Sequence, residues 1–96
     1  MTKKKIFEVQ EIHIYQDSIR AVGTVNTEGW KDPELILRPS SCVGGKCEFD
    51  FVAQPPDGPV TQVMLPIDAT YKSGIVMVNN HFIVYASNNK KGLFLE

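Results

Sequence analysis

The 96-residue sequence has no excess of either charge, which argues against two broad classes of partner. Ten lysines and arginines stand against eleven aspartates and glutamates, so the formal net charge is −1. A chain with this balance has no broad electrostatic field that would attract nucleic acid or an anionic membrane surface. We therefore expect no nucleic-acid partner.

Long apolar runs are also missing. No run approaches the roughly 18 apolar residues of a membrane helix, so we expect no membrane span. The lysines at positions 3–5 resemble the start of a secretory signal, but Glu8 and Glu11 interrupt the apolar stretch that must follow. The sequence thus predicts a cytoplasmic protein, and the alternative is an exported protein whose signal peptide has been removed.

Helical periodicity is absent as well. No ten-residue window places apolar residues at i, i+3, i+4 and i+7 without a glycine or proline. Short runs rich in β-branched and aromatic residues are instead separated by turn formers every 8–12 residues or so, and the length suits one domain, residues 1–96. This pattern predicts an all-β fold, an antiparallel β-sandwich of about eight short strands that is immunoglobulin-like.

The expected strands follow the alternation of apolar and polar residues. The first changes phase near Gln10 and Glu11, which predicts a β-bulge there, and its neighbour begins after a turn at Asp17 and Ser18. Residues 27–33 and 55–59 are expected to be loops. The strands are placed at residues 5–16, 18–26, 34–38, 46–54, 60–67, 73–78, 81–87 and 90–95.

Two asparagine pairs, at residues 79–80 and 88–89, divide the last quarter of the chain into a three-strand meander. Asparagine tolerates the positive φ of two-residue hairpin turns, so these pairs set a register. That register pairs Met77 with Phe82, and Val84 with Leu93.

The meander is apolar on both faces. One face would form the core, and the other would need a cover. The leading prediction is a homodimer that buries this second face; the alternatives are cover by residues 5–16 or 55–59, or another protein partner. The second face consists of Val76, Val78, Ile83, Tyr85 and Phe94.

Two cysteines flank a Gly44-Gly45 turn, so Cys42 and Cys47 would face each other across a hairpin. A non-hydrogen-bonded pair at this place has the separation that a disulfide accepts, which makes the pair a disulfide candidate. The pair would be oxidised to a disulfide in an exported protein and kept reduced in the cytosol. A redox switch and a metal site are the alternatives. The four-residue spacing lacks the two-residue spacing of zinc and redox motifs, so we expect no metal and no cofactor.

Trp30, the only tryptophan, lies in a loop of polar residues and turn formers. An exposed loop tryptophan is a binding anchor, because it offers a large apolar area and one N–H donor. The alternative is a plug that folds back over the end of the sandwich.

No spacing in the chain brings an acid, a base and a nucleophile together, so we predict that the protein is not an enzyme. Asp50 is expected to be solvated or paired with Arg38 or a lysine. The default function is a small non-catalytic module that binds a protein or itself. The alternative is a hydrolase whose site is assembled from distant loops, with His13 or His81 beside a carboxylate in a deep pocket.

Three segments carry a resemblance. Residues 27–35 (TEGWKDPEL), 49–56 (FDFVAQPP) and 60–62 (VTQ) resemble a group of small uncharacterised bacterial proteins, and this likeness implies no activity. Residues 26–30 (NTEGW) also resemble the Asn-Pro-Thr-Thr-Gly loop of chagasin-type cysteine-protease inhibitors, which are immunoglobulin-like and of similar length. That second resemblance implies protease inhibition as an alternative function.

Overall fold

The computed structural model describes residues 3–15, 18–38, 45–72 and 81–94. These residues form eight strands and no helix, which confirms the all-β prediction. With no helix in the described ranges, none is present there that could cross a membrane. The strands are β1 Lys4–Lys5, β2 Glu8–Tyr15, β3 Ser18–Val25, β4 Lys31–Leu37, β5 Lys46–Gln54, β6 Leu65–Lys72, β7 His81–Tyr85 and β8 Lys90–Phe94.

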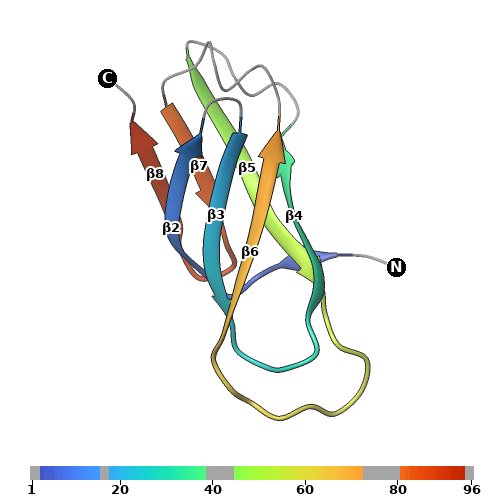
Figure 1. Cartoon of the computed structure of the whole chain (residues 1–96). Helices are drawn as coiled ribbons and strands as arrows, with labels where there is room; N and C mark the ends of the chain where they lie inside the picture. The colour runs from blue at the N-terminus through green and yellow to red at the C-terminus, as the bar shows by residue number, and fades with distance from the viewer. Residues whose placement is uncertain (1–2, 16–17, 39–44, 73–80, 95–96) are drawn as a thin grey trace.

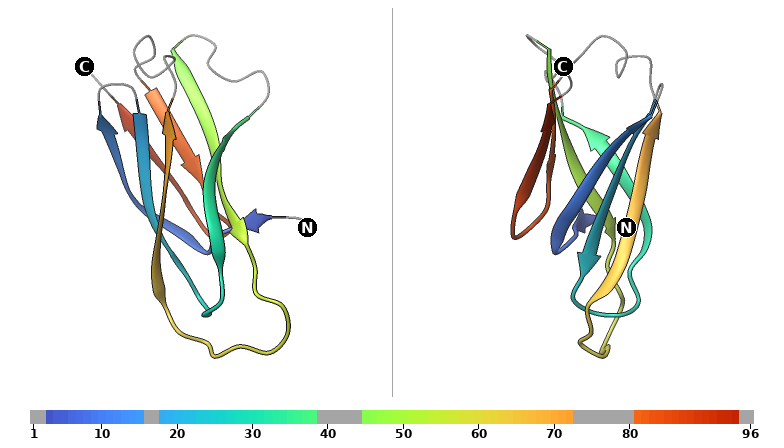
Figure 2. Two further views of the ribbon diagram at one scale, coloured as in Figure 1. Left: turned by 45° about the vertical axis from the view of Figure 1, so that its right-hand side comes forward. Right: turned by 60° about the vertical axis from the view of Figure 1, so that its left-hand side comes forward.

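The strands pack as two sheets, so the β-sandwich prediction is confirmed (Figures 1 and 2). The smaller sheet has the order β2-β3-β6, and the larger contains β1, β4, β5, β7 and β8. In the larger sheet β5 is the central strand, and it pairs with β4, β7 and β1. The β5–β7 pair is parallel, so the expectation of purely antiparallel pairing is wrong at this one place.

The expected strand over residues 5–16 is in fact two strands in different sheets. β1 pairs with the end of β5, and β2 pairs with β3. Ile6 and Phe7 cross between the sheets; Ile6 is fully buried and its N–H donates to the Phe51 carbonyl at 3.0 Å. The predicted bulge is present, because the β2–β3 register shifts between Val9 and Glu11.

β3 shows the alternation that its sequence predicts. Ile19, Ala21 and Val25 are buried and point to the core, while Arg20 and Thr24 between them are half-buried. The expected strand at residues 46–54 coincides with β5, whose Phe49, Phe51 and Ala53 are fully buried.

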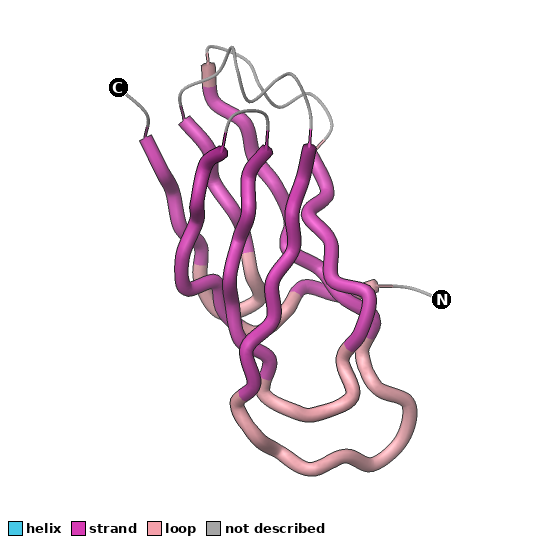
Figure 3. Tube along the Cα trace, viewed as in Figure 1, coloured by secondary structure: helices cyan, strands magenta, loops and turns pink. Residues whose placement is uncertain are grey.

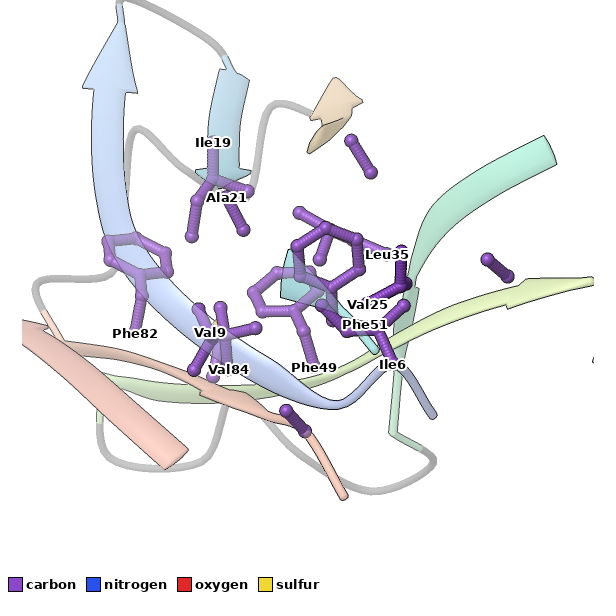
Figure 4. Close-up of a cluster of buried hydrophobic side chains, with 14 residues drawn as sticks. Ile6, Val9, Ile19, Ala21, Val25, Leu35, Phe49, Phe51, Phe82 and Val84 are labelled. Carbon is purple, nitrogen blue, oxygen red and sulfur yellow. The ribbon is translucent and has the colours of Figure 1, made fainter. Parts of the chain in front are cut away.

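The core lies between the two sheets and gathers side chains from both (Figure 4). Phe49 packs edge-to-face on Tyr71 of the opposite sheet, with ring centroids 5.1 Å apart. Such ring pairs add to the stabilisation that burial alone provides. The largest fully buried side chains are Phe49, Phe51, Phe82, Ile6, Ile19, Val9, Val84 and Cys47.

Two strand boundaries differ from the prediction. β4 begins at Lys31 inside the expected loop, and it contains a bulge where Asp32 adopts a φ of 52°. The expected strand at 60–67 begins only at Leu65. Residues 60–64 instead run beside another loop, where Thr61 O accepts from Glu28 N and Val63 N donates to Asn26 O, each at 3.2 Å. Because residues 61 and 63 are hydrogen-bonded to a loop and not to a neighbouring strand, β6 begins later in the sequence than predicted.

The predicted meander is only partly right. β7 and β8 do pair antiparallel, but Phe82 faces Leu93 and Val84 faces Lys91, two residues away from the predicted register. The cause is a four-residue connection, residues 86–89, in which Ala86 N donates to Asn89 O at 2.8 Å. β7 has β5 and β8 as its neighbours, and residues 73–78 with Met77 lie outside the described residues.

Candidate functional site

The outer face of the larger sheet carries a charged network centred on Tyr85. The Tyr85 hydroxyl donates to Glu48 Oε2 at 2.6 Å, and the Arg38 guanidinium carbon lies 3.8 Å from the centre of the Tyr85 ring. Lys90 Nζ lies 5.7 Å from the same centre. The hydrogen bond to Glu48, followed by burial, raises the pKa of the Tyr85 phenol above its ordinary value.

Asp50 takes part in the same network. Arg38 donates to Asp50 Oδ1 from Nε at 3.1 Å and from Nη2 at 2.9 Å, and Lys5 Nζ lies 3.8 Å away from that oxygen. The expected pairing of Asp50 with Arg38 is thus confirmed. Because its charged groups are engaged with one another and with the Tyr85 ring, we interpret the network as a structural feature of the sheet.

Two residues of the predicted second apolar face, Ile83 and Tyr85, lie in or beside this network. Ile83 is only 9% exposed and lies between Glu48 of β5 and Gly92 of β8, and Tyr85 is hydrogen-bonded and stacked under a cation. Long side chains such as arginine and lysine cover apolar surface with their stems, which explains why alternation alone was misleading. Val76, Val78 and the side chain of Phe94 lie outside the described part of the chain, and the homodimer stays a prediction.

A second candidate surface lies at the end of the sandwich formed by residues 26–30 and 55–64, which we call the loop end (Figure 3). Trp30 is half-buried there and packs against the core. Its indole N–H donates to Thr27 Oγ1 at 2.9 Å. The ring is therefore held in place and keeps one part accessible, a position between the expected anchor and the expected plug.

The loop end also exposes a continuous apolar segment. Val63, Met64 and Leu65 are 40%, 53% and 37% exposed, and they follow one another in the chain. They lie where the 60–64 segment is bonded to residues 26–28, so the apolar side chains are presented on a fixed backbone. The sequence prediction missed these residues because it placed them in a strand. Three successive apolar residues without alternation were the signal that could have found them.

Two hollows open at the loop end and share Asn26. One, with a volume of about 390 Å³, is lined by Asn26, Gln62, Val63 and Met64. The other, with a volume of about 460 Å³, is lined by Lys4, Lys5, Phe7, Asn26, Trp30 and Ser87. Both volumes lie in the ~300–1,000 Å³ range that is typical of ligand sites.

The two histidines proposed for a hydrolase lie on different strands, β2 and β7. His13 Nε2 lies 3.5 Å from Glu11 Oε1, but both side chains are more than 40% exposed on β2. His81 is half-buried at the start of β7. Neither histidine lines the two hollows at the loop end.

Cys47 is fully buried at the start of β5, opposite Phe82 of β7. Cys42 lies outside the described residues, so the disulfide stays a prediction. Among the described residues no group of three or more histidine, cysteine, aspartate or glutamate side chains could hold a metal ion.

Comparison with known protein families, curated proteins and solved structures finds no match to this chain.

Proposed function

We propose that the protein is a non-catalytic binding module that recognises an apolar segment of another protein with its loop end. The observation that carries this proposal is the exposed run of Val63, Met64 and Leu65 on a backbone that is hydrogen-bonded to the neighbouring loop. A segment whose backbone is already held by hydrogen bonds loses little backbone entropy on binding. Methionine adapts its shape to apolar partners, which suits a contact surface of this kind.

The residues that flank this apolar run also support a protein-binding surface at the loop end. Trp30 lies at the same end with its indole N–H already bonded to Thr27, so the ring can offer apolar area without an unpaired donor. Asn26 lines both hollows and connects the surface at Trp30 with the surface at Met64. A central apolar contact with a polar rim is the usual composition of protein interfaces.

A peptide-display selection tests the proposal. We expect the wild-type protein to enrich peptides with apolar anchors, and Val63→Asp/Met64→Asp to lose them by at least about tenfold in affinity. Ile36→Asp is the matched control, because Ile36 is 44% exposed on β4, away from the loop end. Peptides that bind both variants equally, or that are lost only with Ile36→Asp, would contradict the proposed surface.

Cysteine-protease inhibition is a second candidate, favoured by one observation. The segment with the chagasin resemblance, residues 26–30, is a loop whose backbone is bonded to a second loop at the same end of a β-sandwich. A titration of papain activity tests it: we expect inhibition that Trp30→Ala weakens and Ile36→Asp leaves unchanged. Full papain activity at about 100 µM protein would eliminate this candidate.

A further inference from the structure

The hollow beside Trp30 is lined by positively charged, aromatic and neutral polar side chains, and by no negatively charged one. Its six residues, Lys4, Lys5, Phe7, Asn26, Trp30 and Ser87, include two lysines and no aspartate or glutamate. Two aromatic side chains supply apolar surface, and the remaining polar groups are an amide and a hydroxyl. Apolar walls with a few polar groups are the usual composition of a small-molecule site.

The two lysines do not have the same role, because neighbouring residues of a strand point to opposite faces. Lys5 pairs with Val52, and its ammonium lies 3.8 Å from Asp50 on the outer face. Lys4 pairs with Ala53, which is fully buried, so Lys4 lies on the inner side of the sheet at the rim of the core. An apolar residue would be expected at such a position.

Within the part of the chain that the structure describes, Lys4 is also a cation without a counter-charge. It is exposed, and no ion pair or hydrogen bond joins its ammonium to another side chain within residues 3–15, 18–38, 45–72 and 81–94. Its neighbours Lys3 and Lys5 both have acidic partners, Glu34 at 2.9 Å and Asp50 at 3.8 Å. Of the three lysines, Lys4 is thus the one whose charge no described residue pairs, so this charge can meet a ligand.

The aromatic side of the hollow is held in place by contacts of its own. The Trp30 indole N–H is hydrogen-bonded to Thr27. Phe7 lies in the segment that crosses between the sheets, and its own carbonyl accepts a hydrogen bond from Asn88 N at 2.9 Å. Ser87 N donates to the Ile6 carbonyl at 2.8 Å, which places the Ser87 side chain at the same rim. Three separate parts of the chain therefore build the hollow.

We propose that this hollow binds the carboxylate of a compact acid with an aromatic or aliphatic body. The carboxylate binds the Lys4 ammonium, Asn26 and Ser87 supply further donors from the lining of the same hollow, and the body packs against Trp30 and Phe7. The carboxylate belongs either to a free acid or to the last residue of a peptide. The site is distinct from the apolar run of Val63, Met64 and Leu65, and it stands whether or not that run binds a protein.

The experiment uses Trp30 as its reporter, because it is the only tryptophan of the chain. The full-length protein is titrated with 3-phenylpropionate and with the neutral 3-phenylpropanol. We expect a saturable change in Trp30 emission with the acid, at a Kd on the order of 1 mM, and at least about tenfold weaker binding of the alcohol. Shifts of the Asn26 and Ser87 amide resonances in ¹H–¹⁵N spectra provide a readout that does not depend on fluorescence.

Matched variants locate the charge. Lys4→Gln should weaken binding of the acid by about tenfold and leave the alcohol unchanged. Lys72→Gln removes the same charge at the end of β6 that lies away from the loop end, and this variant should bind the acid like the wild type. Because both substitutions are at exposed positions, the variants should unfold at wild-type urea concentrations, which separates lost binding from lost structure.

A second pair of ligands distinguishes the source of the carboxylate. Acetyl-Gly-Phe with a free carboxylate that binds more tightly than 3-phenylpropionate indicates a peptide C-terminus, and equal or weaker binding indicates a free acid. The C-terminal amide of the same peptide should bind like the alcohol. The proposal is overturned if the alcohol binds as well as the acid, if Lys4→Gln binds like the wild type, or if no saturable change occurs up to about 10 mM ligand.

Discussion

The side-chain amide of Asn89 hydrogen-bonds both backbone groups of Val9. Val9 N donates to Asn89 Oδ1 at 2.8 Å, and Asn89 Nδ2 donates to Val9 O at 3.0 Å. Val9 lies at the β-bulge of β2, where the ladder to β3 is interrupted. The asparagine side chain thus takes the place of a strand neighbour and joins the two sheets of the sandwich.

We expect Asn89→Ala to destabilise the protein by about 1–3 kcal/mol, because it leaves two backbone groups of the buried Val9 without their partners. Asn88→Ala is the control, since the Asn88 side chain makes only an exposed bond to Glu8 at 2.9 Å, and its cost should stay below about 0.5 kcal/mol. Urea unfolding at neutral pH measures both. An equal loss of unfolding free energy in the two variants would show that the hydrogen bonds of Asn89 to Val9 do not stabilise the protein beyond an exposed contact.

A second prediction concerns Gly23 in the middle of β3. A Cβ at this position would meet the carbonyl oxygen of Glu8 and would lie 2.5 Å from Ile6 Cδ1, so Gly23→Ala should cost about 2 kcal/mol or more. Gly92→Ala is the comparison, because its Cβ would have ordinary contacts of 3.4 Å or longer and should change stability by no more than about 0.5 kcal/mol. Thermal or urea unfolding compares the two, and a neutral Gly23→Ala would contradict the close approach.

The raised pKa of Tyr85 predicts a pH dependence of stability. A phenol whose pKa is higher in the folded than in the unfolded protein adds stability below its ordinary pKa of about 10, and this contribution is lost as the pH rises through the folded value. Tyr85→Phe keeps the ring under Arg38 but removes the bond to Glu48.

The measurement for Tyr85 is the free energy of unfolding from pH 7 to pH 11 for both proteins. The wild type should exceed Tyr85→Phe by about 0.5–1.5 kcal/mol at pH 7, and the difference should shrink above about pH 10. Lysines also titrate in this range, but they do so in both proteins and cancel in the difference. A gap that stays constant to pH 11 would contradict the role of the phenol proton.

Trp30 provides a fourth prediction. Because the ring is half-buried against the core and its N–H is bonded to Thr27, we expect its emission to lie between that of an exposed and that of a fully buried tryptophan. Thr27→Val should shift this emission to the blue, since it removes the polar partner of the indole. Acrylamide quenching as fast as that of free tryptophan would mean that the ring does not pack on the core.

The sequence alone predicted those elements whose pattern is set locally. The alternation in β3 and β5, the β2–β3 hairpin and the bulge near Gln10 all depend on the two-residue period of a strand, and the structure confirms them. The prediction from sequence fails where contacts between distant parts of the chain determine which strands pair. The parallel pairing of β5 with β7 joins segments more than thirty residues apart, and no local pattern specifies it.

The candidate site shows the same division. Trp30 was identified from the sequence because a lone loop tryptophan is locally visible, whereas Lys4 was not, since three consecutive lysines look alike until pairing with Ala53 and Val52 gives them different faces. Tyr85 and Ile83 were assigned to an apolar surface because alternation ignores which charged side chains the neighbouring strands bring.

The hydrogen bonds of Ser87 and Asn88 to the carbonyls of Ile6 and Phe7 have a consequence for how the chain is made. The crossing at Ile6 and Phe7, which carries the chain from one sheet to the other, is bonded to the turn between β7 and β8, far along the sequence. Until that turn has emerged, Ile6 has no complete site to enter, and the first strands can form only a partial hairpin. The sandwich can therefore close only after β7 and residues 86–89 have been made, and the newly made chain exposes its core-forming residues for longer than a protein built from local contacts would.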